Sequence, residues 1–280
     1  MKSIRLNSCE VRWAENEADI DAAQTRRYQV FYDEMGARPT PSCRQLERDS
    51  DPYDEICDHL LVIDLEHSRP GAPKVVGTYR LLRGSVANAS AGFYSEDEFD
   101  LSQLLNYPGE IMELGRSCIN PEYRRRGAMQ LLWRGIADYI FRHKVQLMFG
   151  CGSIHGTNPK EVKRLLAYLH HYHRAPKPLR ARALDRRYVL MDTMEKKHID
   201  TKLAQAEMPP LLKGYLRLGG YVGDGAVIDH QFNTIDVCII VETEKITNRY
   251  IRHFAKDNVE ALPNAAGVAA EREMRPLPSL

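Results

Sequence analysis

Residues 110–151 decide the fold and read EIMELGRSCINPEYRRRGAMQLLWRGIADYIFRHKVQLMFGC. Glu110–Asn120 has the pattern of a strand, and Pro121–Gly127 has the composition of a polar turn. Ala128–His143 carries a helical stripe of apolar residues, and Val145–Cys151 is a short apolar run typical of a central strand. A further amphipathic helix is predicted at Lys160–His173. The order strand, helix, strand, helix predicts a right-handed crossover in a partly parallel sheet.

The pattern on the N-terminal side predicts a helix at 17–36, a loop at 37–58, a two-stranded hairpin at 59–82 and a mostly irregular segment at 84–109. On the C-terminal side it predicts a basic segment at 174–210, a short helix at 211–218, a glycine-rich stretch at 221–228 and a last strand at 235–241. A strand is expected near Tyr188–Met191. We predict one domain over residues 1–255. Residues 256–280 are rich in Ala, Glu and Pro without periodicity, so we predict a disordered tail there.

The composition describes a globular protein. The chain has 280 residues, 39 Lys and Arg against 38 Asp and Glu, and 43% hydrophobic residues, which excludes a disordered, collagenous or coiled-coil chain. Its six cysteines form neither a C-x-x-C pair nor a zinc-finger spacing, so a reduced, cytoplasmic protein is expected. No secretory signal begins the sequence, and no apolar run is long enough to span a bilayer. Any membrane contact is therefore expected to be peripheral, at the inner face of the membrane.

The turn before the central helix, Arg124-Arg125-Arg126-Gly127, is a candidate phosphate site. A helix N-terminus presents unpaired N–H groups, glycine lets the backbone approach closely, and arginine adds charge-assisted hydrogen bonds. A solvated basic turn is the alternative. Between Arg116 and His143 arginines outnumber acidic residues, and this local excess would attract an acidic partner. The near-neutral net charge of the whole chain does not favour binding to nucleic acid.

Arg124-x-x-Gly127 followed by a helix resembles the pyrophosphate loop of the GNAT acyltransferases, from which Met129 departs. The resemblance implies a GNAT-like α/β (α+β) fold, in which a mixed, mostly antiparallel sheet splays around a central strand and is flanked by helices. Met129 favours a donor with one phosphate, the phosphopantetheine thioester of an acyl carrier protein. That group is a substrate, and the resemblance implies no bound cofactor and no metal. The donor would contact Ile119, Arg124, Arg125, Arg126 and Gly127.

Longer segments are similar to the ornithine N-acyltransferases that begin ornithine-lipid synthesis, among them 113-ELGRSCINPEYR-124, 130-QLLWRGI-136, 210-PLLKGYLRLG-219 and 228-IDHQFNTID-236. The similarity covers roughly residues 17–255. A more distant resemblance is to acyl-homoserine-lactone synthases, without a tryptophan that they carry. The residues of this chain that match the pattern of those synthases are Arg27, Phe31, Asp51, Asp54, Arg80, Glu113 and Arg116.

Glu113 is the first candidate for the general base, because an amine attacks a thioester only when it is unprotonated. Strand alternation places Glu113 and Arg116 on opposite faces unless a bulge intervenes, and GNAT relatives splay at this strand. A structural ion pair between Glu113 and Arg116 is the alternative. By family analogy, a backbone N–H near 118–120 would stabilise the oxyanion. Tyr168 as an acid, and Cys118 or Cys151 as a nucleophile, compete with simple packing roles.

For an ornithine acceptor, Asp51 and Asp54 are candidates for the side-chain ammonium, and Arg80 or Arg27 for the carboxylate, with Phe31 beside them. Turn chemistry explains the two aspartates equally well. His170 and His173 share a helix face, but no carboxylate lies at ligand spacing in the sequence, so a basic helix end is favoured over a metal site. The glycines at 219–225 are expected to let the backbone pass close to the acyl chain or the acceptor.

The expected activity is transfer of a (3-hydroxy)acyl chain from acyl carrier protein to the α-amine of L-ornithine, which gives lyso-ornithine lipid. The alternatives are another amino acid acceptor, a signal-lactone synthase that uses S-adenosylmethionine, and a GNAT domain that only binds carrier proteins. The basic residues within 174–187 either touch anionic lipid or form a solvated loop.

Overall fold

The computed structural model describes residues 4–245 of the chain. The residues form one mixed sheet with the strand order β1-β2-β3-β4-β6-β7-β11-β10-β8-β5, and β9 pairs with β10. The strands are β1 Ile4–Leu6, β2 Cys9–Trp13, β3 Asp58–Asp64, β4 Val75–Arg83, β5 Phe99–Asp100, β6 Glu110–Ile119, β7 Val145–His155, β8 Arg182–Ala183, β9 Tyr188–Val189, β10 Tyr221–Asp229 and β11 Thr234–Glu242. The helices are α1 Glu17–Tyr28, α2 Pro41–Leu46, α3 Gly84–Ala87, α4 Ser102–Leu105, α5 Ala128–His143, α6 Lys163–His173, α7 Thr201–Glu207 and α8 Pro210–Arg217.

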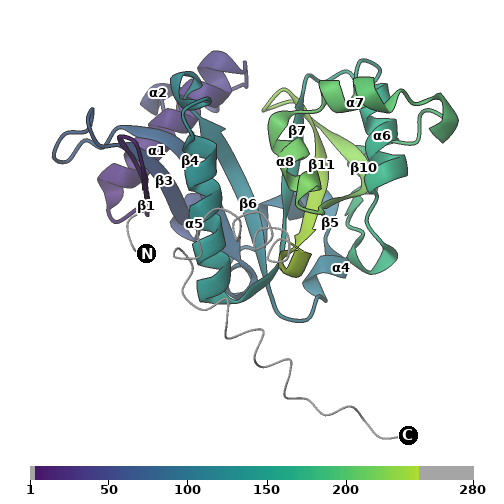
Figure 1. Cartoon of the computed structure of the whole chain (residues 1–280), viewed down its shortest axis with the longest axis horizontal. Helices are drawn as coiled ribbons and strands as arrows, with labels where there is room; N and C mark the ends of the chain where they lie inside the picture. The colour runs from purple at the N-terminus through teal and green to yellow at the C-terminus, as the bar shows by residue number, and fades with distance from the viewer. Residues whose placement is uncertain (1–3, 246–280) are drawn as a thin grey trace, which may run out of the picture.

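The unit β6–α5–β7 is the predicted crossover, because β6 and β7 are parallel neighbours joined by α5. Most other pairings are antiparallel, as expected. Figure 1 shows α5 on the side of β6 that holds β1, β3 and β4, with β7, β11 and β10 on the other side of β6. The structure therefore confirms the mixed, mostly antiparallel sheet and the central crossover.

The sheet splits between its two central strands. β6 pairs with β7 only from Glu110 opposite Val145 to Glu113 opposite Phe149. Beyond that point β6 continues beside β4, and β7 continues beside β11 as far as His155. A Cβ atom on Gly150 would lie 2.2 Å from the Leu114 carbonyl oxygen, so the strands touch here before they diverge.

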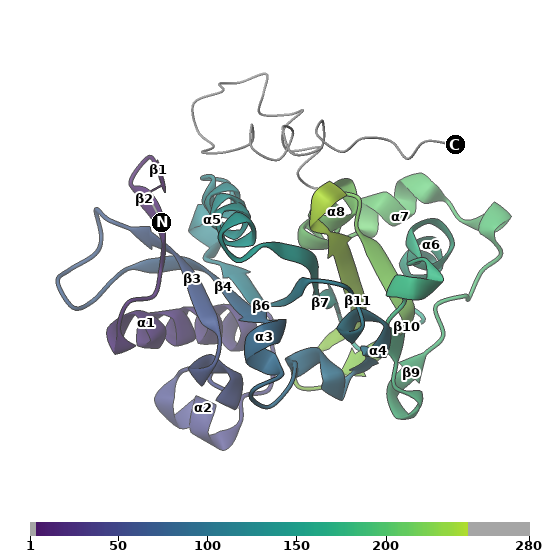
Figure 2. The ribbon, with the colours of Figure 1, turned by 90° about the horizontal axis from the view of Figure 1, so that it is seen from below.

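Helices cover both faces of the sheet. α5, α6 and α8 pack on one face over a core that includes Leu60, Leu131 and Val237. On the opposite face α1 packs near β3 and β4, and the segment with α3, α4 and β5 packs Phe93 and Phe99 against β7 and β11. Figure 2 shows α1 and α5 on opposite sides of β3 and β4. Alternate residues of the strands thus face two separate cores.

Several local expectations differ from the structure. The hairpin of β1 and β2 was not predicted, since its strands are short and mostly half-buried. The predicted helix 17–36 changes to a wider π-helical turn at Gln29–Glu34, and α2 lies within the predicted loop. The glycine-rich stretch is largely the strand β10. Gly223 approaches the Ala181 carbonyl and Gly225 approaches the Tyr188 ring, so these glycines serve strand packing and not the cavity described below.

The predicted tail at 256–280, and residues 246–255 of the predicted domain, lie outside the described residues. Among residues 4–245, no helix combines the length and the apolar character needed to cross a bilayer.

Candidate active site

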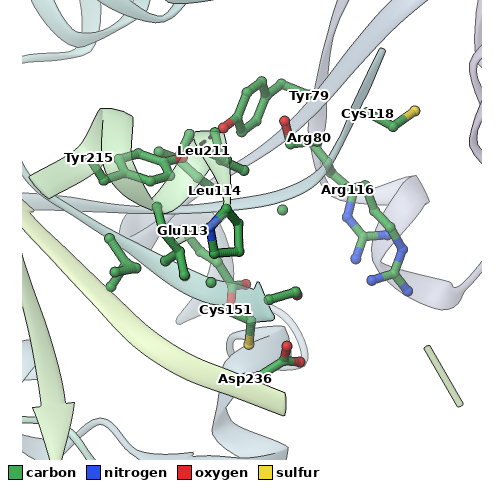
Figure 3. A pocket seen from close by; sticks show the side chains of 18 of the residues that line it. Tyr79, Arg80, Glu113, Leu114, Arg116, Cys118, Cys151, Leu211, Tyr215 and Asp236 are labelled. Atoms are coloured by element: carbon green, nitrogen blue, oxygen red, sulfur yellow. Dashed lines mark hydrogen bonds between the residues drawn. The ribbon is translucent and has the colours of Figure 1, made fainter. Parts of the chain in front are cut away.

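A cavity of about 540 Å³ lies where β6 and β7 diverge. Because the sheet is open there, residues from both of its faces line the same space. On the α8 face the lining is apolar and comes from Met148, Leu211, Leu212, Tyr215, Ile239 and Val241. On the opposite face it is polar and comes from Tyr94, Ser95, Glu113, Cys151, Ser153, Thr234 and Asp236. Figure 3 shows Tyr79 and Tyr215 on one side of Glu113, Arg80 and Arg116 on another, and Cys151 with Asp236 on a third.

A bulge in β6 brings Glu113 and Arg116 to this one cavity. Thr78 pairs with Cys118 and Arg80 with Gly115, so β6 has one more residue than β4 over this step. Arg116 takes a positive φ of 49°, which is rare for a residue with a side chain. The conditional prediction of a bulge is therefore confirmed.

Glu113 is buried and held by three donors. The backbone N–H groups of Tyr94 and Ser95 donate to its carboxylate at 2.9 and 2.8 Å, and the Ser95 hydroxyl donates at 2.5 Å. Burial raises the pKa of Glu113, and the hydrogen bonds of Ser95 oppose that rise. The result is a fixed carboxylate with raised basicity at the point where the strands separate.

Arg116 pairs with aspartates and not with Glu113. Its Nη2 lies 2.7 Å from Asp51 Oδ2, and its Nε lies 3.1 Å from Asp49 Oδ2. The rings of Tyr94 and Phe232 each lie 4.7 Å from its guanidinium carbon. The alternative of a Glu113–Arg116 ion pair is therefore wrong within the described residues.

Asp49 and Asp51 belong to a larger cluster, the ion-pair network, whose members are Arg27, Asp49, Asp51, Asp54, Arg80 and Arg116. Arg80 Nη1 lies 2.6 Å from Asp51 and 2.9 Å from Asp54, and Arg27 Nη2 lies 2.6 Å from Asp54. Burial acts to raise the pKa of Asp54, but Arg27 and Arg80 outweigh burial and hold that pKa below its ordinary value. Three arginines and three aspartates thus neutralise one another.

The network revises the predicted acceptor residues. Phe31 and Arg80 line the cavity, whereas Arg27, Asp51 and Asp54 lie behind its wall. Arg27 is only 1% exposed and already paired, so its place favours positioning over contact with a carboxylate. Asp49 was missed, because nothing in its local sequence separates it from the other polar residues of that loop.

The basic turn opens onto the same cavity as Glu113. Arg124 and Ile119 line it, and Arg124 pairs with Glu34 at 2.6 Å. Gly127 begins α5 with φ 85°, and no described side chain caps the helix. Arg125, Arg126 and Gly127 do not line the cavity, and Arg126 lies over the ring of Tyr123. The turn thus contributes Arg124 to the cavity, and the first turn of α5 contributes Met129.

The other sequence candidates are distributed unevenly. Tyr168 is buried in α6, accepts a hydrogen bond from Gln205 and does not line the cavity, so its position favours packing over the role of an acid. Cys118 and Cys151 line the cavity, but burial raises the pKa of both thiols, that of Cys118 to about 11, which disfavours a thiolate nucleophile. The fold brings Asp192 to 3.0 Å from His171, a carboxylate that sequence spacing did not reveal.

Sequence reasoning also missed Ser95, Glu98 and Tyr94, which come from the irregular segment before β6. Asp229, Thr234 and Asp236 were quoted within similar segments but received no role. The available signal was Asp236 itself, a charged residue inside an otherwise apolar strand.

Comparison with known proteins found a matching family model and curated relatives. The family model described as an acetyltransferase (GNAT) domain matches residues 26–134. An L-ornithine N(alpha)-acyltransferase of Brucella abortus (strain 2308) is 48% identical over 90% of this chain and 91% of its own length. One of Rhizobium meliloti (strain 1021) is 46% identical over 90% and 86%.

Among solved structures, the N-acyl amino acid synthase FeeM from uncultured soil microbes has a TM-score of 0.47, with 11% identity over 86% of this chain and 93% of its own. The AHL synthase LasI has a TM-score of 0.46, with 14% identity over 84% and 89%. The sequence relatives decide the assignment, and the chain belongs to the L-ornithine N(alpha)-acyltransferase family of GNAT-fold acyltransferases.

Proposed function

We propose that the protein transfers a (3-hydroxy)acyl chain from the phosphopantetheine thioester of an acyl carrier protein to the α-amine of L-ornithine, giving lyso-ornithine lipid. The observation that carries the proposal is the cavity through the split sheet, which joins Arg124 to Glu113 and has an apolar and a polar side. The names of the curated relatives, which are L-ornithine N(alpha)-acyltransferases, also support the proposal.

The donor would enter beside the basic turn. Arg124 would exchange its exposed partner Glu34 for the phosphate, and Met129 in the first turn of α5 lines the same cavity. Ile119, next to Arg124, would contact the pantetheine arm. Arg125 and Arg126, which are exposed outside the cavity, would attract the acidic surface of the carrier protein.

The acyl chain fits the α8 side of the cavity. Leu211, Leu212 and Ile239 form an apolar wall there, and burial of each methylene of the chain contributes about 0.8 kcal/mol. The thioester would then lie at the split, beside the part of β6 that has no strand partner on the β7 side. Backbone N–H groups facing the split are the candidate donors to the oxyanion.

Glu113 would act on the attacking amine. An α-amino group has a pKa of about 7.7–8.0, so a modest base is sufficient near neutral pH. The amine nitrogen attacks the thioester carbon, Glu113 accepts the proton that the nitrogen loses, and the C–S bond breaks. The pantetheine thiolate leaves and is protonated. No covalent enzyme intermediate is needed.

Initial rates with purified protein test the proposal. Acyl carrier protein and coenzyme A thioesters of one acyl chain are compared as donors, and ornithine, other amino acids and S-adenosylmethionine are compared as acceptors. We expect an acyl-ornithine product from the carrier-protein donor. Absence of acyl transfer from both donors to every amine would contradict the proposal and favour a domain that only binds carrier proteins.

The product is amphiphilic, so release to the inner face of the membrane belongs to the same proposal. The basic segment 174–187 offers less free charge than its sequence suggests, because Arg174, Arg182 and Arg187 pair with acidic side chains. Sedimentation with anionic and neutral vesicles tests peripheral contact, and equal recovery in both supernatants would exclude a lipid role for this segment.

A further inference from the structure

The polar side of the cavity holds a second group of ionisable residues, which the mechanism above does not use. We call it the acidic lobe and define it as Glu98, Cys151, Asp229, Thr234 and Asp236. Thr234 and Asp236 are on β11 and face the same side as Cys151 and Ser153 of the paired strand β7. Cys151 Sγ lies 3.4 Å from both Glu98 Oε2 and Ser95 Oγ. Figure 3 shows Cys151 beside Asp236, below Glu113.

Two oxygen atoms in the acidic lobe lack a well-formed hydrogen bond. Asp236 Oδ1 and Thr234 Oγ1 are buried, and neither has a hydrogen bond of normal geometry from any described residue. Asp236 is 4% exposed and Thr234 is 2% exposed, and both line the cavity. A buried carboxylate oxygen without a well-formed hydrogen bond costs free energy, so a cavity wall that retains one is a place where a donor on a ligand is expected.

The charge of the acidic lobe is unbalanced. Glu98, Asp229 and Asp236 meet one described cation, Arg187, which lies 3.2 Å from Glu98. Burial, and then the charge of Asp236, raise the pKa of Glu98, and burial raises that of Asp236, although the Ser153 and Thr234 hydroxyls oppose the rise. A cation at this place would relieve the repulsion between the two carboxylates.

The acidic lobe lies beyond Glu113 along the split. Glu113 is level with Phe149, and Asp236 is opposite Ser153, four residues further along β7. The Ser95 hydroxyl connects the two carboxylate regions, since it donates to Glu113 and contacts Cys151. The side chains bring the two regions closer than the register alone would, because the ligand atoms of Glu98, Cys151 and Asp236 lie within 4.8 Å of one another. A molecule with one amine at Glu113 and a second amine at the end of a short methylene chain would fit these contacts.

A second hollow adjoins the acidic lobe, and such a molecule would enter through it. It is lined by Glu98 and Arg187, and it shares Tyr94 and Asp229 with the main cavity. The donor end at Arg124 and this entrance are lined by different elements, so donor and acceptor need not compete for one opening.

Building on the proposed function, we propose that the acidic lobe binds the side-chain ammonium of the diamino acid acceptor, with Asp236 and Thr234 as direct hydrogen-bond acceptors and Glu98 as the supporting charge. These residues determine specificity: they select a cationic side chain over a neutral one, while Glu113 serves the α-amine.

The test compares ornithine with norvaline, the analogue that lacks the side-chain nitrogen, in the full-length protein and in Asp236→Asn and Thr234→Val. Binding of each amino acid is measured by calorimetry, with and without acyl carrier protein, and turnover is measured separately. We expect Asp236→Asn to weaken ornithine binding about tenfold to a hundredfold and Thr234→Val about twofold to tenfold. Norvaline binding should change less than about threefold, since it has no donor for either oxygen.

The ratio of the two affinities within one variant is independent of the fraction of folded protein. Asp33→Asn is the matched control, because Asp33 is exposed, lines neither hollow and loses the same charge. Equal affinity of the wild-type protein for both amino acids, or an equal loss for both in Asp236→Asn, would overturn the inference even if acyl transfer occurs. Conversely, ornithine preference without turnover would support the lobe and contradict the proposed reaction. Loss of the preference in EDTA, restored by Zn²⁺, would assign the lobe to a metal and overturn the inference.

Discussion

The two polar walls of the cavity differ in how completely their charges are paired. In the ion-pair network every arginine contacts at least one aspartate and every aspartate at least one arginine. In the acidic lobe two buried oxygens have no well-formed hydrogen bond and carboxylates exceed cations, whereas the one such atom of the network, Arg27 Nε, still lies 2.8 Å from Asp49. A wall whose charges are paired with one another shapes the site, whereas a ligand is expected at a wall with buried polar atoms that lack hydrogen bonds. Glu113 lies between the two and is hydrogen-bonded by a third segment, Tyr94–Ser95.

The largest expected effect concerns Glu113. If its carboxylate takes the amine proton, Glu113→Gln should lower kcat by about a hundredfold to ten-thousandfold, because the amide keeps the shape but cannot accept a proton. Steady-state rates across pH provide the measurement. Wild-type activity in Glu113→Gln at every pH would remove Glu113 from the reaction and leave it as a structural partner of Ser95.

The next prediction tests the ion-pair network. Arg27→Ala should lower the free energy of unfolding by about 3–5 kcal/mol, because it leaves Asp49 and Asp54 buried without one of their cations. Denaturant unfolding measures this change. Asp138→Ala is the control, since its ion pair with Arg142 is exposed and should contribute at most about 1 kcal/mol. Similar losses in both variants would show that the network is not a stabilising core.

A smaller effect is expected at the donor end. Arg124→Ala should raise KM for the acyl carrier protein about tenfold with little change in KM for the acceptor, since one partly exposed charge-assisted hydrogen bond to phosphate is lost. Arg44→Ala, at an exposed arginine on α2, is the matched control for net charge. If both variants lose the same donor affinity, the turn acts only by general attraction and not as a phosphate site.

The smallest effect is a pH dependence of stability. The pKa of Asp54 is held below its ordinary value in the folded state, so the unfolded chain takes up the proton first as the pH falls. Its contribution is therefore fully present above about pH 4 and is lost as the pH drops below that value, with a slope of up to about 1.4 kcal/mol per pH unit. Unfolding followed between pH 7 and pH 3 should show a shallower fall in Asp54→Asn than in the wild-type protein.

The sequence predicted the parts of the fold that depend on local pattern. Ala128–His143 has a strong helical stripe and an arginine-rich start, and the structure has the helix at those residues. The crossover followed from the apolar run after it. The hairpin of β1 and β2 could not be predicted in this way, because short, half-buried strands carry little alternation.

The sequence predicted the site residues that can be recognised one at a time. It did not predict those whose role depends on pairing with a distant residue. Glu113 and Arg116 were expected in one site if β6 bulged, and the positive φ of Arg116 supplies the bulge. The sequence could not show that Asp49 belongs to the ion-pair network, or that Asp51 and Asp54 form ion pairs with arginines. Those facts depend on contacts between residues far apart in the chain, such as Arg116 and Asp49.

The position of the new amide bond tests the central claim most directly. Ornithine carrying ¹⁵N only at the α-nitrogen is incubated with the full-length protein and an acyl carrier protein thioester, and the product is fragmented by tandem mass spectrometry. If Glu113 serves the α-amine while the acidic lobe holds the side-chain ammonium, the acylated nitrogen carries the label. An unlabelled amide nitrogen, or no acylated ornithine, would contradict the account.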